Sequence, residues 1–186
     1  MSQALKTIIL SVVATTVACG GGGDGGGGGS NVVTSNLTPS FVADPVDAGG
    51  GFVSMTEDSV AGDVITIAVL VTDAEKIYGA AFDLTYDPTV AVFQSWAPGT
   101  LLEQGGNGPN YTVDAPRAGT VVVGASRTGN VPAVTAGGRT LIRLTFKVLQ
   151  PGNTQLSFRS ASLIDNRIPP EEIPGLSWFG GSLVVV

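Results

Sequence analysis

Residues 139–149 show the strictest alternation of apolar and polar side chains in the chain, and this pattern constrains the fold more than any other feature. From Ile142 to Val148 every second residue is apolar, and the residues between them are charged or carry a hydroxyl group. Alternate side chains of an extended strand lie on opposite faces, so one face of this strand is specified as buried and the other as exposed. The pattern therefore predicts a β-sheet with one face against a hydrophobic core.

Other short segments share this extended character. The apolar residues are mostly valine, glycine and proline are frequent, and no long segment has helical spacing. Residues 63–72 are apolar on both faces, which predicts a strand inside a sheet. An all-β fold is therefore expected, and a two-sheet β-sandwich suits so many short strands. We predict nine strands, near residues 40–43 and at 63–72, 80–86, 90–93, 111–114, 120–125, 139–149, 154–160 and 182–186.

The first 18 residues have the layout of a bacterial secretory signal peptide. Lys6 precedes an apolar segment, residues 7–14, that is too short to span a bilayer comfortably. Residues 16–19, Thr-Val-Ala-Cys, resemble the lipobox of bacterial lipoproteins, in which the signal is cleaved before a cysteine that carries diacylglycerol. Cys19 is the only cysteine, and an exposed free thiol is a liability in an oxidising compartment, which favours lipid attachment. The alternative is a secreted protein in which Cys19 is an incidental thiol.

Residues 20–29 are glycine apart from one aspartate, and such a chain loses too much backbone entropy to adopt a fixed structure. We predict that residues 19–36 form a lipidated cysteine and a disordered flexible tether, followed by one domain at 37–186. Gly20 replaces the aspartate that retains such lipoproteins at the inner membrane. The resemblance therefore implies a lipid-anchored protein of the cell envelope, at the outer membrane or cell surface.

Composition excludes several function classes. Loss of Lys6 with the leader leaves eight basic and fifteen acidic residues, a net charge near −7, which argues against a nucleic-acid partner. The chain has no histidine, so it lacks the usual ligands of zinc and copper and the usual base of a serine or cysteine nucleophile. Asp165, Glu171 and Glu172 could bind calcium, but no spaced calcium loop is present, which favours a solvated acidic loop. We expect no catalytic residue, no metal site and no cofactor.

The order of the segments resembles the cohesin domain, the jelly-roll module that binds dockerin domains in cellulosomes. The resemblance covers about residue 38 to the C-terminus and implies a nine-stranded jelly-roll β-sandwich, in the same broad superfamily as carbohydrate-binding modules. The segments that carry it are residues 61–67, 82–90, 98–99, 141–149 and 179–185.

The resemblance also implies a binding face made by the strands predicted at 79–86, 111–115, 120–126 and 154–160. Cellulosomal cohesins place polar, aromatic and acidic side chains at key positions of this face. The residues that align here are small and offer few side-chain hydrogen bonds; they are Gly79, Ala81, Ala115 and Ser126. The candidate face comprises Gly79, Ala81, Asp83, Thr112, Asp114, Ser126, Arg127, Ser157 and Arg159.

These features together predict a non-enzymatic recognition module that holds a dockerin-bearing protein at the cell envelope, in the context of polysaccharide degradation. Two alternatives stay open. One is direct binding of polysaccharide through exposed aromatic residues, for which the candidates are Trp96, Tyr111, Trp178 and Phe179. The other is a structural subunit of a secretion or pilus-type assembly.

Overall fold

In residues 36–104 and 108–186 the regular secondary structure consists entirely of β-strands. The computed structural model describes these two ranges, so the predicted signal peptide, Cys19 and residues 19–35 of the predicted tether lie outside the described residues. No helix in the described ranges is long and apolar enough to cross a membrane. The strands are β1 (Pro39–Ala43), β2 (Phe52–Ala61), β3 (Val64–Thr72), β4 (Ala74–Ile77), β5 (Gly79–Thr85), β6 (Ala91–Pro98), β7 (Asn110–Arg117), β8 (Thr120–Ser126), β9 (Val134–Ala136), β10 (Arg139–Val148), β11 (Gly152–Ile164), β12 (Ser177–Trp178) and β13 (Gly181–Val185).

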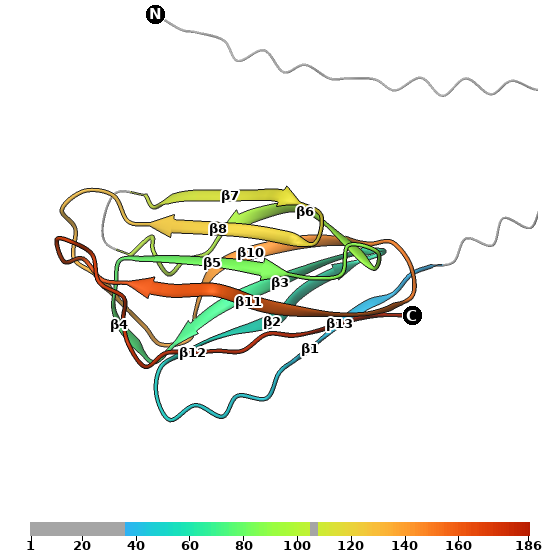
Figure 1. Ribbon diagram of the computed structural model, residues 1–186, viewed down its shortest axis with the longest axis horizontal. Coiled ribbons are helices and arrows are strands. Elements are labelled where there is room, and N and C mark those ends of the chain that lie inside the picture. The colour runs from blue at the N-terminus through green and yellow to red at the C-terminus, as the bar shows by residue number, and fades with distance from the viewer. Residues whose placement is uncertain (1–35, 105–107) are drawn as a thin grey trace, which may run out of the picture. The chain divides into compact units, whose positions relative to one another are not determined.

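The strands form two large sheets and one small one. A six-stranded sheet has the order β1-β13-β11-β5-β8-β7, and a five-stranded sheet has the order β12-β2-β3-β10-β6. β4 and β9 make a separate two-stranded ladder. All neighbours are antiparallel except β12 and β2, which are parallel. Figure 1 shows β7, β8, β5 and β11 side by side, with strands of the second sheet behind them.

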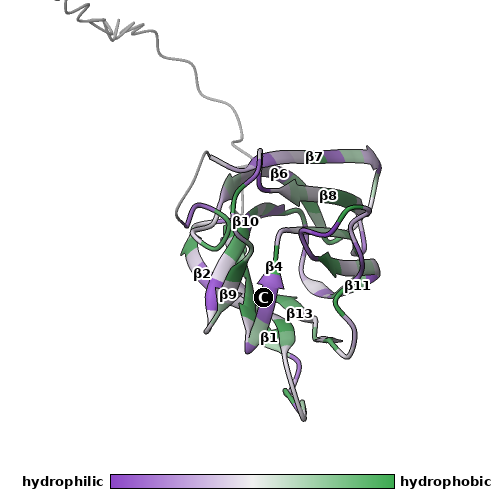
Figure 2. Cartoon of the chain, turned by 90° about the vertical axis from the view of Figure 1, so that its left-hand side faces the viewer, coloured by the Kyte–Doolittle hydropathy of each residue, from purple (hydrophilic) through white to green (hydrophobic). Residues whose placement is uncertain are grey.

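The alternation along β10 explains how the sheets pack. Leu144 and Phe146 are fully buried, and both lie in the core between the sheets. Tyr86, which directly follows β5, packs edge-on against Phe146 with 5.3 Å between the ring centroids, so the two layers share one core. In the end-on view of Figure 2, apolar residues occur on the strands of both layers. The all-β sandwich expected from the sequence is therefore confirmed.

The nine predicted strands are all present, and the structure adds β2, β4, β9 and β12 to them. β3 lies between β2 and β10, which explains why both of its faces are apolar. The ten-residue strand β2 escaped prediction because residues 56–59 are four consecutive polar residues. A register shift between Glu57 and Ser59 occurs within this run, so its side chains do not alternate regularly.

Candidate binding face

The four strands assigned to the binding face are adjacent in the six-stranded sheet, in the order β11-β5-β8-β7. Their register aligns the outward-facing residues in rows across the sheet. One row is Arg159, Asp83, Val122 and Asp114; the next is Ser162, Ala81, Gly124 and Thr112; the third is Ile164, Gly79, Ser126 and Asn110. The pairing of β11, β5, β8 and β7 thus gathers residues from positions 79 to 164 on one surface.

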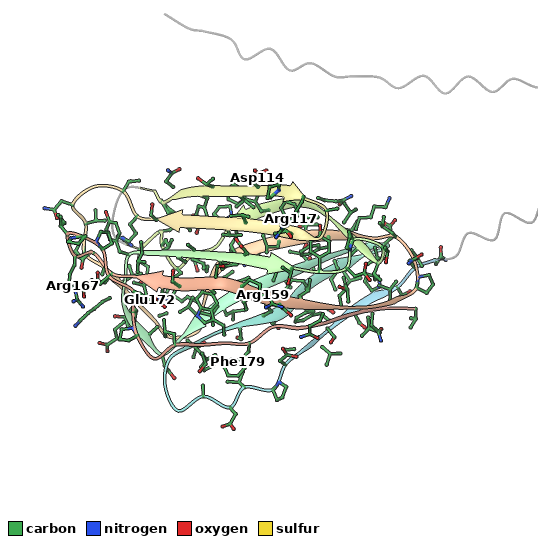
Figure 3. The ribbon with its side chains drawn as sticks, viewed as in Figure 1. Asp114, Arg117, Arg159, Arg167, Glu172 and Phe179 are labelled. Atoms are coloured by element: carbon green, nitrogen blue, oxygen red, sulfur yellow. The ribbon has the colours of Figure 1, made fainter. Side chains whose placement is uncertain are left out.

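The first row carries the charges of the face. Arg159 and Asp83 are directly opposite each other on neighbouring strands. Among the described residues, neither side chain has an ion-pair or hydrogen-bond partner in this structure. Asp114 is exposed, and one of its carboxylate oxygens accepts the backbone N–H of Ala115 at 2.8 Å. Figure 3 shows Arg159 and Asp114 on separate strands of this sheet.

The second row is made of small side chains. Ala81 and Thr112 are exposed, and Gly124 lies between them. A methyl group built on Gly124 would meet only the Thr112 carbonyl oxygen, 3.9 Å away, so the space above this glycine is open. The centre of the face is therefore a low strip to which another backbone can approach closely.

The third row contributes less surface than the sequence suggested. Gly79 is buried, and a methyl group there would come within 2.7 Å of the Ala125 carbonyl oxygen and 3.1 Å of the Ile164 side chain. Ile164 is the cross-strand partner of Gly79 and covers it. Gly79 therefore belongs to the candidate strands but offers no exposed atom for a partner, whereas Ser126 is half-buried.

The assignment of Arg127 to the exposed face is wrong. The residue is only 3% exposed, and its guanidinium group donates to the carbonyl oxygens of Leu102, at 3.0 Å, and Gln104. Its Nε is buried without a hydrogen-bond partner among the described residues. Successive residues of a strand face opposite sides, so Arg127 faces inward because Ser126 faces outward. The prediction placed Arg127 on the exposed face because a charged side chain is usually exposed. The side chain holds the loop after β6 in place.

β11 contributes different residues to the face from those that strict alternation predicts. Ser157 and Arg159 face outward, but the register shifts between Arg159 and Ser162, and Ser160 has a left-handed backbone with φ of 45°. This bulge turns the even-numbered Ser162 to the same side as the odd-numbered Arg159. Ser157 is half-buried, and its carbonyl oxygen accepts the Thr85 hydroxyl at 3.3 Å.

The aromatic residues proposed for polysaccharide binding are not gathered on one surface. Trp178 lies on β12 and Trp96 on β6, the two opposite edges of the five-stranded sheet. Trp178 packs against Phe158 with ring centroids 5.0 Å apart. Trp96 packs on Tyr111, whose hydroxyl donates to the Leu141 carbonyl oxygen at 2.8 Å and whose pKa burial raises to about 12. These rings support the sandwich and do not share one sugar-stacking platform.

Acidic residues near the C-terminus form a closed loop. The Asp165 side chain is 4% exposed and accepts the backbone N–H groups of Arg167 at 3.1 Å and Glu171 at 3.0 Å. These hydrogen bonds, that from Glu171 first, hold the pKa of Asp165 below its ordinary value. The Arg167 guanidinium pairs with both acids. In the described part of the chain, no three such ligand residues cluster to hold a metal ion.

A two-layer β-sandwich with one open, four-strand face defines a class of binding module, and the family comparison identifies it. Residues 52–167 match the cohesin domain family, and the chain belongs to that family. Cohesin domains are non-catalytic interaction modules, which agrees with the expectation that the chain is not an enzyme. No curated protein matches the sequence. The matched range omits β1, β12 and β13, which complete the two large sheets.

Solved cohesin structures share the fold at low sequence identity. The second type II cohesin module of the adaptor ScaA scaffoldin of Acetivibrio cellulolyticus is 21% identical, with a TM-score of 0.58 over 74% of this chain and 91% of that one. CaCohA2 from Clostridium acetobutylicum is 16% identical, with a TM-score of 0.58 over 74% and 90%. The sixth cohesin of Acetivibrio cellulolyticus scaffoldin B, solved with a Cel5 dockerin, is 17% identical, with a TM-score of 0.56 over 71% and 96%.

Proposed function

We propose that this chain is a cohesin module that holds a dockerin-bearing protein at the cell envelope, and that the partner docks on the outward surface of β11, β5, β8 and β7. The observation that carries the proposal is this open face in a chain of the cohesin family. Several related cohesins were solved in complex with dockerins. The partner's remaining domains, in this proposal, include an enzyme of polysaccharide degradation.

The dimensions of the face suit a docked helix. Four strands about 4.8 Å apart, with exposed residues about 6.8 Å apart along each strand, give a surface of roughly 14 Å by 14 Å over three rows. A helix with its side chains is about 10–12 Å wide, so one helix covers the strip of Ala81, Gly124 and Thr112. Small residues let a partner backbone approach closely, and contact area then replaces the side-chain hydrogen bonds that the face lacks.

The charges of the first row give the partner its orientation. Arg159 and Asp83 have no ion-pair partner among the described residues, so each is available to a charge of opposite sign. A partner that places an acidic side chain near Arg159 and a basic one near Asp83 binds in one register, and the reversed register brings like charges together.

In this proposal the N-terminal segment sets where the module works. Lipid attached to Cys19 anchors the chain, and the glycine tether of residues 20–29 lets the domain stand clear of the headgroups. Anchoring raises the effective concentration of the bound partner at the envelope surface, which is the whole contribution that such a module makes. No chemistry is required of the module itself.

The proposal is tested by titrating the full chain with each dockerin module encoded in the source genome, in an isothermal calorimeter. We expect at least one dockerin to bind. Ala81→Arg places a long side chain on the central strip, and we expect it to weaken binding at least about thirtyfold, the effect of losing about 2 kcal/mol. The matched control is Ala61→Arg, because Ala61 is an exposed alanine on β2, in the other large sheet.

The two variants separate the proposed face from a nonspecific effect of charge. Equal affinities for Ala81→Arg and Ala61→Arg would show that the partner binds elsewhere. Absence of binding to every dockerin would refute the partner class itself. Retardation of the chain by soluble polysaccharides in affinity electrophoresis, abolished by Trp96→Ala or Trp178→Ala, would support the carbohydrate alternative instead.

A further inference from the structure

A groove of about 430 Å³ lies at one end of the sandwich, outside the candidate face. Its walls are two loops, residues 129–131 and 165–170, and Tyr78 lies between them. The apolar part of the lining is Tyr78, Val131, Ile168 and Pro170. Figure 3 shows Arg167, a residue of the second loop, at the end of the sandwich, and Arg159 further along the same sheet.

The groove adjoins the last row of the candidate face. Ile164 and Gly79 are cross-strand partners in the last row of the face. Asp165, which follows Ile164, and Tyr78, which precedes Gly79, both line the groove. Tyr78 donates its backbone N–H to the Ile164 carbonyl oxygen at 2.8 Å, and Arg127 donates its own to the Tyr78 carbonyl oxygen at 2.9 Å. A partner lying along β5 therefore reaches the groove after the row of Gly79.

Both walls are held in place before any partner arrives. The Tyr78 hydroxyl donates to the Gly129 carbonyl oxygen at 2.5 Å and fixes the first loop. The second loop is closed by a backbone hydrogen bond from Asp165 N–H to the Glu171 carbonyl oxygen at 2.9 Å and by the buried Asp165 carboxylate. A preformed groove loses less conformational entropy on binding than a flexible one.

Ile168, in the second loop, is 100% exposed, the largest exposed fraction among the big apolar side chains of the described residues. Its loop is held by polar contacts of Asp165 and Arg167, so the fold does not need an apolar residue at position 168. Arg167 already pairs with Asp165 and Glu171, which leaves the apolar lining as the main recognition surface of the groove.

We infer that this groove is a second contact site for the same dockerin-bearing partner, and that it takes an apolar side chain of that partner against Ile168 and Tyr78. The inference rests on the proposed function, because the partner reaches the groove only if it docks on the candidate face. Contacts on the face set the register of the partner, and the groove contacts the end of the docked segment.

The test is a calorimetric titration of full-chain variants with a purified dockerin module that binds the unchanged chain. Ile168→Ser is expected to weaken binding about tenfold, and Ile168→Leu to stay within about twofold of the unchanged chain. The matched control is Leu149→Ser, because Leu149 is also an exposed apolar loop residue and has the same size as isoleucine; its exposed fraction is 48%. Leu149 precedes the start of β11, whereas Ile168 follows its end. We expect the control to bind normally.

Hydrogen exchange on the complex gives a second readout. Residues 165–171 should gain protection when the dockerin binds. Unchanged affinity of Ile168→Ser, or no added protection in this loop, would overturn the groove inference while Ala81→Arg still tests the face. Absence of any dockerin binding by the unchanged chain would overturn the proposed function, and the inference with it.

Discussion

Arg127→Met is the substitution that best distinguishes the buried position of Arg127 in the structure from the exposed position predicted from the sequence. Methionine keeps the apolar stem and removes the guanidinium group. The hydrogen bonds to the carbonyl oxygens of Leu102 and Gln104 are then lost. If Arg127 lay on the exposed face, the same change would reduce partner binding and leave stability almost unchanged.

The expected loss follows from how deeply each acceptor is buried. Leu102 is fully buried, so water cannot readily replace the guanidinium donor that its carbonyl oxygen loses. Leaving this oxygen without a donor costs about 1–3 kcal/mol. Gln104 is half-buried, and water can replace part of its bond. Removing a buried charge whose Nε has no described partner offsets some of this cost. We expect a net loss of about 2 kcal/mol, which corresponds to a fall in Tm of about 4–8 °C for a domain of this size.

Urea unfolding followed by tryptophan fluorescence measures the free energy, and calorimetric titration with a binding dockerin measures the affinity. Arg127→Lys serves as the graded control, because an ammonium group can donate to one of the two carbonyl oxygens; its loss should be intermediate. An unfolding free energy of the Met variant within about 0.5 kcal/mol of that of the unchanged chain, the usual range for a surface substitution, would refute this account of Arg127.

Three further predictions concern charge and titration. Hydrogen bonds hold the pKa values of Asp165 and Asp87 below 3.8, and the main donors are the backbone N–H groups of Glu171 and Thr89, respectively. The two carboxylates therefore stabilise the fold fully above pH 3.8, and this stabilisation is lost as the pH falls through their folded pKa values. In thermal melts at acid pH, the stability of Asp165→Asn should depend less on pH than that of the unchanged chain. Tyr111 should titrate near pH 12 in a spectrophotometric titration, because burial disfavours its phenolate; a pKa near 10 would contradict its packing. Asp83→Lys should weaken dockerin binding about tenfold in 50 mM salt and less at 500 mM, whereas an effect independent of salt would argue against a charge contact.

The sequence predicted the strands with a long run of alternating side chains, and it missed the ten-residue strand β2, in which four consecutive polar residues hide the alternation. β10 alternates from Ile142 to Val148 and β5 from Ala80 to Leu84, and both strands were placed within one residue of their observed bounds. β2 contains a shift between Glu57 and Ser59 and was not predicted. A bulge depends on what the neighbouring strand pairs with, and a single sequence does not reveal that partner.

The same reason limits what could be predicted of the face. The four strands that the resemblance to cohesins indicated are adjacent in one sheet, and Ala81, Asp83 and Thr112 occupy outward positions on them. Ser162 was missed because the bulge at Ser160 reverses the parity of β11. Val122 and Gly124 could have been assigned to the face, since they lie four and two residues before Ser126 on the same side of β8. They were not selected because neither side chain is polar or charged.

Both edges of the six-stranded sheet are blunted, which favours its face over its edges as the docking surface. At the β1 edge, Pro39 has no N–H to donate, and the Phe41 N–H is already taken by the Glu57 carboxylate at 2.9 Å. At the β7 edge, Pro116 lacks an N–H, and the Asp114 carboxylate accepts that of the residue between them.

A partner strand that added to either edge would meet missing or occupied donors, and natural sheets use such features to prevent edge-to-edge pairing. The outward surface of β11, β5, β8 and β7 has no such obstruction, since Ala81, Thr112 and Arg159 are exposed. Recognition by strand addition is thereby disfavoured, and this favours the proposed mode, in which a helix of the partner lies across the small-residue strip.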